Sequence, residues 1–186
     1  MAVCLFAFGP RGGFAGIGAA NLLTGARLLG VAGLLALAPE HNHWIALATG
    51  LAWVFDGVDG WLARRMGESS TFGAQWDMET DSHVMLLVCL HLIVTLHLGV
   101  WILTMGGLRY VYVLLRFATV TREVRERRSS WGRSIYSLAI CSLALGCVPE
   151  WSTFAVPLMA AATLALCGSF APDFLALVRP DHSTIA

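Results

Sequence analysis

The sequence predicts an all-α integral membrane protein, with six transmembrane helices around a polar cavity that faces the cytoplasm. Three observations support this prediction. Hydrophobic residues make up 57% of the 186 residues and charged residues only 13%, whereas soluble domains contain about 45–50% apolar and about 25% charged residues. Six apolar stretches approach the roughly 20 residues that a transmembrane helix needs. Pairs of aspartates interrupt two of these stretches.

The first three predicted spans are residues 14–37, 44–62 and 72–97. The first ends at the polar turn Ala-Pro-Glu-His-Asn-His. The second ends with one pair of aspartates, and the third begins with another pair after a short connection that contains arginine. We therefore expect the second and third spans to form an antiparallel hairpin, with both acidic pairs at the same depth in the membrane.

The last three predicted spans are residues 100–118, 132–148 and 154–171. Proline lacks the backbone N–H that a helix interior uses. Pro149 is therefore expected to end the fifth span, and Pro172 the sixth.

We expect residues 1–186 to form a single transmembrane domain, in which the apolar residues 1–13 could lie at the membrane interface. All 12 basic residues are arginine. Outside the spans, arginines occur after the second and fourth spans and near both ends of the chain, and none occurs after the first, third or fifth span. The positive-inside rule then places both termini and the acidic helix ends in the cytoplasm. The net charge of zero gives no electrostatic argument for nucleic-acid binding.

The two acidic pairs have helical spacing. Asp56 and Asp59 are three residues apart, and Asp77 and Asp81 are four apart, so each pair projects from one helix face. Acidic side chains in membrane segments are costly and indicate function by default. Four hard oxygen ligands suit Mg²⁺ or Mn²⁺. Four carboxylates exceed the need of one Mg²⁺, so two ions are expected, an arrangement that serves phosphoryl chemistry.

Small residues occur beside these aspartates. Gly60 and Ala63 follow the acidic pair of the second span, and Gly73 precedes that of the third. Glycine costs roughly 1 kcal/mol in a helix, but the missing side chain lets a ligand lie against the backbone. Arg64 at the end of the hairpin is placed to bind a phosphate. The stretch therefore predicts a metal-bridged diphosphate whose sugar and base lie on a glycine-lined helix.

The spacing of these residues resembles the full signature of the CDP-alcohol phosphotransferase (CDP-alcohol phosphatidyltransferase) family. The matching pattern is Asp56-x-x-Asp59-Gly60-x-x-Ala63-Arg64, then eight residues, then Gly73-x-x-x-Asp77-x-x-x-Asp81. The segment Asn21-x-x-Thr24-x-x-Arg27 is similar to an opening common in bacterial members. The six-span topology also resembles the family's core, so the resemblance covers most of the chain. In size the chain is nearest to bacterial phosphatidylglycerophosphate synthases.

The resemblance implies a metal-dependent transferase of phospholipid biosynthesis. A hydroxyl of an acceptor alcohol attacks the phosphorus of a CDP-linked donor, usually CDP-diacylglycerol, and CMP leaves. The family pattern implies two Mg²⁺ or Mn²⁺ ions held by Asp56, Asp59, Asp77 and Asp81, with Asp81 also the catalytic base. It implies CDP-donor contacts from Gly60, Ala63, Arg64 and Gly73, with Asn21 and Thr24 nearby. It also implies a homodimer, in a bacterial inner or plasma membrane.

Arginines in the later spans bear on the acceptor. Arg109 and Arg116 are seven residues apart and share one helix face, and Arg133 opens the fifth span. A deep arginine usually serves a ligand anion, which favours a phosphorylated acceptor such as glycerol 3-phosphate or an inositol phosphate. Alternatively, Arg109 pairs with Asp77 or Glu79.

Three other questions stay open from the sequence. Serine or another unphosphorylated alcohol is the alternative acceptor. A small cation- or proton-coupled transporter is the alternative from another class, because intramembrane carboxylates also line ion pathways. The histidines of the third span are expected to pack or to form hydrogen bonds rather than to bind metal; these are His83, His91 and His97.

Overall fold

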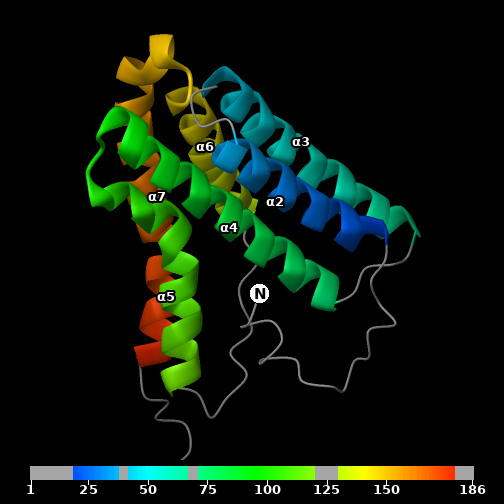
Figure 1. Cartoon of the computed structure of the whole chain (residues 1–186). Helices are drawn as coiled ribbons and strands as arrows, with labels where there is room; N and C mark the ends of the chain where they lie inside the picture. The colour runs from blue at the N-terminus through cyan, green and yellow to red at the C-terminus, as the bar shows by residue number, and fades with distance from the viewer. Residues whose placement is uncertain (1–18, 38–41, 67–70, 120–129, 179–186) are drawn as a thin grey trace, which may run out of the picture.

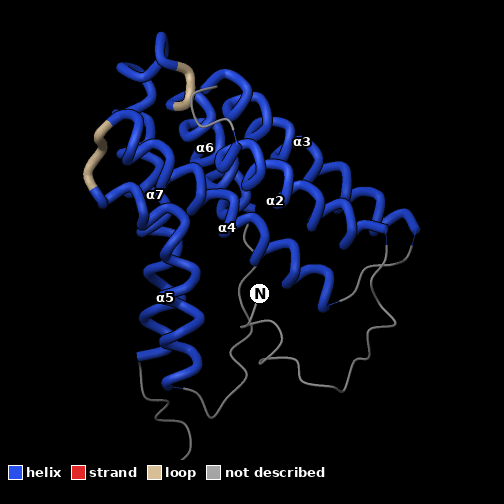
Figure 2. Tube along the Cα trace, in the orientation of Figure 1, coloured by secondary structure: helices blue, strands red, loops and turns tan. Residues whose placement is uncertain are grey.

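A computed structural model describes residues 19–37, 42–66, 71–119 and 130–178, and leaves undescribed some side chains near the ends of these ranges. The predicted segment 1–13 lies outside the described residues. Within the described ranges the chain is helical apart from two short loops, as Figure 2 shows. The helices are α2 (Ala19–Leu37), α3 (Asn42–Met66), α4 (Thr71–Leu96), α5 (Leu103–Thr119), α6 (Ser130–Gly146) and α7 (Ser152–Val178), with short 3₁₀ helices η2 (Val100–Ile102) and η3 (Pro149–Trp151). The all-α prediction is confirmed.

Helix α2 packs along both α3 and α4, whereas α3 and α4 contact each other at only a few residues. Figure 1 shows α2 lying between the other two. The second and third predicted spans, α3 and α4, are therefore bridged by α2 over most of their length. The apolar residues of α2 fill the space between its two neighbours, and this arrangement brings side chains of α2 to the acidic ends of α3 and α4.

Helix α4 is the centre of the core. One of its faces is fully buried and consists of Val84, Met85, Val88, Cys89 and Leu92. Helix α5 crosses it closely, because a Cβ added at Gly106 would lie 2.7 Å from the backbone nitrogen of Leu86. Small residues permit such close approach between helices in membranes. Helices α5 and α7 lie side by side, and α6 packs against α3 and α7 (Figure 1).

Two segments of the described chain, Trp76–Leu96 and Pro149–Leu175, are long and apolar enough to cross a membrane, judged by length and composition. Thr24–Leu37 and Val100–Leu115 are shorter apolar helices. Large apolar side chains are exposed on several helices, for example Leu164 of α7 at 74%. The six-span topology stays a prediction beyond these two segments.

The helix ends follow the predicted bounds closely, with one exception. His97 has a positive φ of 53° directly after α4, the left-handed geometry that commonly ends a helix. Pro149 begins η3 after α6 has ended. The predicted stop at Pro172 is wrong, because α7 continues to Val178 with Pro157 and Pro172 inside it. A proline removes one backbone hydrogen bond, which neighbouring helices and local adjustment can offset in an apolar setting.

Candidate metal centre and active site

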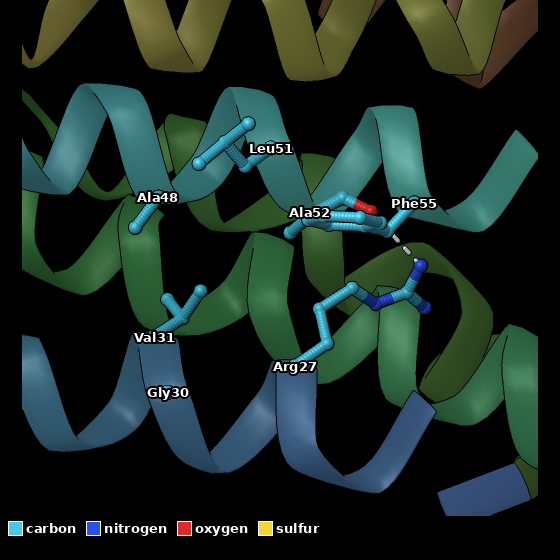
Figure 3. A pocket seen from close by; sticks show the side chains of 7 residues that line it. All are labelled: Arg27, Gly30, Val31, Ala48, Leu51, Ala52 and Phe55. Carbon is cyan, nitrogen blue, oxygen red and sulfur yellow. Dashed lines mark hydrogen bonds between the residues drawn. The ribbon is translucent and has the colours of Figure 1, made fainter. Parts of the chain in front are cut away.

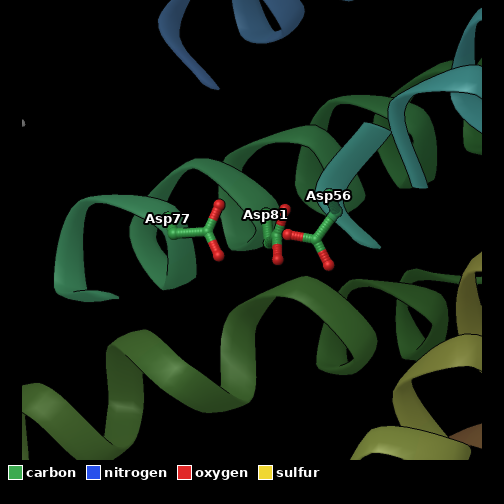
Figure 4. Close-up of side chains that lie close together, drawn as sticks. All are labelled: Asp56, Asp77 and Asp81. Atoms are coloured by element: carbon green, nitrogen blue, oxygen red, sulfur yellow. The ribbon is translucent and has the colours of Figure 1, made fainter. Parts of the chain in front are cut away.

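Three of the four predicted aspartates converge at one point of the fold. Asp56 comes from α3, and Asp77 and Asp81 come from successive turns of α4. One carboxylate oxygen from each lies within 4.8 Å of the others, and Figure 4 shows the three side chains pointing toward one another. All three are partly exposed. Two distant segments thus form one acidic cluster with access to solvent.

Arg27 of α2 lies among these carboxylates. Its Nη2 is 2.7 Å from Oδ1 of Asp81 and 3.4 Å from Oδ1 of Asp77. Its Nη1 is 3.5 Å from Oδ1 of Asp56 and donates a hydrogen bond of 3.0 Å to the carbonyl oxygen of Ala52. The side chain is only 5% exposed. A single buried guanidinium is therefore shared by three carboxylates and cannot neutralise them all.

Helix α6 also reaches the cluster. The hydroxyl of Tyr136, a half-buried residue, forms a hydrogen bond with Asp81. Asp81 is thus contacted from two sides, by Arg27 of α2 and by Tyr136 of α6. It is also the least exposed of the three, with 16% of its side chain accessible against 36% for Asp77.

The residues present fit a divalent cation. All donors are carboxylate oxygens, which Mg²⁺ and Mn²⁺ prefer. Oδ1 of Asp56 is buried and has no hydrogen-bond donor among the described residues. The three oxygens lie within 4.8 Å of one another, close enough for side-chain rotations to bring them onto one ion. The side chain of Asp59 lies outside the described part of the structure, although the residue is within α3.

The predicted donor-binding residues lie on the helices that form the cluster. Thr24 is buried on α2, one turn before Arg27. The others lie on α2, α3 and α4, and their side chains are outside the described part; they are Asn21, Gly60, Ala63, Arg64 and Gly73.

An apolar groove adjoins the cluster between α2 and α3. It has a volume of about 250 Å³, and Arg27 lies at one end of it (Figure 3). Its other lining residues are Gly30, Val31, Ala48, Leu51, Ala52 and Phe55. The buried guanidinium thus has carboxylates on one side and apolar space on the other.

The predicted acceptor arginines are not brought together in the described residues. Arg109 forms an ion pair of 3.1 Å with Glu79, and both side chains are buried, at 13% and 8% exposure. Its Nη1 also lies 3.6 Å from the sulfur of Met78. Arg133 is exposed on α6, and the side chain of Arg116 lies outside the described part. The pairing of Arg109 with Glu79 is the alternative that the sequence left open.

The histidines of the predicted third span form hydrogen bonds, as expected. Nδ1 of His83 lies 2.6 Å from the carbonyl oxygen of Glu79 and 2.8 Å from the hydroxyl of Tyr110. Nε2 of His91 lies 3.0 Å from Oδ1 of Asn42. Nδ1 of His97 lies 3.0 Å from the carbonyl oxygen of Val94.

Sequence reasoning assigned no role to two residues of the cluster. Arg27 was noticed only as part of a family-like opening, although an arginine deep in an apolar span is itself a signal. Tyr136 gave no signal, because nothing in the sequence places α6 against α4 at this level.

Comparison with known proteins gives one match. The family model for CDP-alcohol phosphatidyltransferase matches residues 18–168. Nothing among the curated proteins or the solved structures matches this chain. The matched range contains the three converging aspartates, Arg27 and Tyr136, and it covers most of the 186 residues. The chain therefore belongs to the CDP-alcohol phosphatidyltransferase family.

Proposed function

We propose that this protein is a membrane enzyme that transfers the phosphatidyl group of CDP-diacylglycerol to the hydroxyl of a small alcohol and releases CMP. Its family transfers phosphatidyl groups from a CDP-alcohol. The observation that carries the proposal is the convergence of Asp56, Asp77 and Asp81 from two helices within 4.8 Å. Such a cluster suits a reaction that handles a diphosphate with divalent metal ions.

The proposed metal centre contains Asp56, Asp59, Asp77 and Asp81. Two bound Mg²⁺ or Mn²⁺ ions would supply electrostatic stabilisation of the charge that develops on the transferred phosphate. Oδ1 of Asp56 supports this role, because it is buried without a hydrogen-bond donor in the described residues. Asp77 is the most exposed of the three aspartates, which makes it accessible to a substrate.

Asp81 is the proposed base. A hydroxyl oxygen of the acceptor forms a bond to the phosphorus of the phosphatidyl group, and its proton passes to a carboxylate oxygen of Asp81. The bond from phosphorus to the oxygen of CMP breaks, and CMP leaves with that oxygen. Contacts from Arg27 and Tyr136 support the role, because they hold the Asp81 carboxylate in a defined orientation. General acid–base catalysis depends on such positioning.

We propose that the donor's CDP part lies along the same helix ends. Thr24 is buried on α2, one turn before Arg27, which supports a place close to the donor. The other proposed contacts rest on the family-like spacing; they are Asn21, Gly60, Ala63, Arg64 and Gly73.

The acceptor is proposed to be a phosphorylated alcohol, glycerol 3-phosphate or an inositol phosphate, with Arg116 and Arg133 binding its phosphate. Arg109 was the third candidate, but Glu79 already neutralises it. This ion pair favours a second candidate reaction, the same transfer to an unphosphorylated acceptor such as serine. Both reactions use one metal centre and differ only in the acceptor.

The proposed setting is a single domain over residues 1–186 with six spans, both termini and the acidic helix ends in the cytoplasm of a bacterium. The protein would act there as a homodimer. Two helices of sufficient length and apolarity support membrane insertion.

The decisive test is turnover of CDP-diacylglycerol by the purified protein in lipid vesicles. Glycerol 3-phosphate, an inositol phosphate and serine are offered separately, and CMP release and the lipid product are measured. We expect CMP release with one acceptor, and its loss in excess EDTA. Turnover that persists in EDTA would contradict the metal centre. Release with serine alone would select the unphosphorylated acceptor, and no release with any of the three would contradict the proposed acceptors.

A further inference from the structure

Arg27 occupies the position in which the three carboxylates converge. Its two terminal nitrogens lie within 3.5 Å of an oxygen from each of Asp56, Asp77 and Asp81. These are the carboxylates that the proposed metal centre would use. A guanidinium donates to carboxylates in the plane of its fork, so it and a metal ion cannot keep all of these contacts at once.

We propose that Arg27 is an exchangeable internal counter-ion, which competes with divalent cations for the aspartates and moves off Asp81 when they bind. This inference rests on the metal centre of the proposed function. Cations bound to the same three carboxylates lie only a few ångströms apart, and their repulsion is screened only weakly in a partly buried site. The contact of 2.7 Å between Nη2 and Asp81 is the closest of the three and is the one expected to break.

The surroundings of Arg27 allow this movement. Its Nη1 is held by the carbonyl oxygen of Ala52 on α3, a contact that involves no carboxylate. Its Nε has no hydrogen-bond partner among the residues that the structure describes. The groove between α2 and α3 leaves space beside the aliphatic part of the side chain. The guanidinium can therefore pivot about the Ala52 contact while Nη2 leaves Asp81.

A fixed structural role and an exchangeable role for Arg27 predict opposite changes in metal affinity when Arg27 is removed. If Arg27 only held the aspartates in place, its removal would let them separate and would weaken metal binding. If Arg27 competes with the metal, its removal frees the oxygens and strengthens binding. The sign of the change in affinity therefore distinguishes the two roles, and it does so without any measurement of turnover.

The experiment measures Mn²⁺ binding by electron paramagnetic resonance on the purified full chain, without substrate. Arg27→Met removes the charge and keeps an unbranched apolar stem. We expect it to lower the Mn²⁺ dissociation constant about tenfold or more. Arg27→Lys keeps the charge and should lower the Mn²⁺ dissociation constant less than Arg27→Met does. Arg109→Met is the matched control, since it also removes a largely buried arginine that pairs with an acid of α4, and the folded variant should keep its Mn²⁺ affinity.

Thermal unfolding gives a second readout. In EDTA, Arg27→Met should unfold at a lower temperature than the unmodified protein, because three carboxylates lose their counter-ion. Mn²⁺ should raise its melting temperature more than that of the unmodified protein, because tighter binding stabilises the folded state more. Should Arg27→Met not fold even with Mn²⁺, nuclear magnetic resonance of the unmodified protein decides, since Mg²⁺ should shift the Nη signal of Arg27.

Unchanged or weaker Mn²⁺ binding by a folded Arg27→Met variant would overturn the exchange. An Arg27 Nη resonance that does not shift at saturating Mg²⁺ would overturn it as well. Mn²⁺ binding by the unmodified protein would then still support the metal centre. If neither the unmodified protein nor Arg27→Met binds Mn²⁺, the metal centre itself fails and the exchange fails with it. If Arg27→Met binds Mn²⁺ and the unmodified protein does not, Arg27 excludes the metal in the absence of substrate, which would support the exchange.

Discussion

Two buried arginines contact opposite faces of α4, and their partners differ. Arg27 approaches from α2 and shares its charge among three carboxylates. Arg109 approaches from α5 and forms its ion pair with Glu79. Glu79 is two positions from both Asp77 and Asp81, about 200° around a helix of 3.6 residues per turn. One helix therefore carries an acidic cluster on one side and a closed ion pair on the other.

The comparison shows how charge balance separates a site from a structural contact. Arg109 and Glu79 neutralise each other. The backbone carbonyl of Glu79 also contacts His83, and His83 contacts Tyr110. Around Arg27, one positive charge faces three carboxylates among the described residues. Buried ions are costly without partners, so an excess that persists in the fold indicates a ligand. Four predictions test this distinction.

The largest effect is expected from removal of a carboxylate of the cluster. Asp56→Ala or Asp77→Ala should abolish CMP release, because each removes an oxygen ligand of the proposed metal centre. The assay is CMP release in lipid vesicles, with size-exclusion elution as the control for folding. A folded variant that keeps its turnover would show that the cluster is no more functional than the Arg109–Glu79 pair.

The second effect concerns stability rather than chemistry. Arg109→Met leaves Glu79 buried without its partner, and breaking a buried pair costs about 3–5 kcal/mol. We expect a clear fall in melting temperature and partial recovery when Glu79→Gln is added. If stability is unchanged and only the acceptor KM rises, Arg109 binds acceptor phosphate after all, and the two arginines are alike in function.

The third prediction concerns the proposed base. Asp81→Asn should reduce kcat by roughly 10²-fold or more, the usual scale of general acid–base catalysis, while binding of the CDP donor is nearly retained. Donor binding can be measured by calorimetry and kcat by CMP release. Equal loss of both would assign Asp81 chiefly to metal binding.

The smallest effect is expected at Tyr136. Tyr136→Phe removes the hydroxyl that contacts Asp81 and keeps the ring, and a hydrogen bond of this kind contributes about 1.5–3 kcal/mol when one partner is charged. We expect kcat to fall by about tenfold, with the KM values and the melting temperature little changed. Tyr110→Phe on the other side of α4 is the matched control and should leave kcat unchanged; an equal fall in both variants would contradict a special role for Tyr136.

The sequence by itself determined the features that depend on neighbouring residues. Apolar runs and polar turns predicted the α class and nearly all helix bounds, because helical hydrogen bonds join residues four apart. The spacing of Asp56 with Asp59, and of Asp77 with Asp81, predicted the acidic faces for the same reason. The family-like signature, which the match over residues 18–168 confirms, is also a local pattern.

Only the tertiary structure decided what surrounds those aspartates. Helix α2 lies between α3 and α4 and inserts Arg27 into the cluster, while α6 adds Tyr136. The choice of Glu79 as the partner of Arg109 depends on how α5 crosses α4 at Gly106. The continuation of α7 through Pro172 is likewise a result of its surroundings. Each of these features depends on packing between segments far apart in the chain, which residue spacing along one helix does not encode.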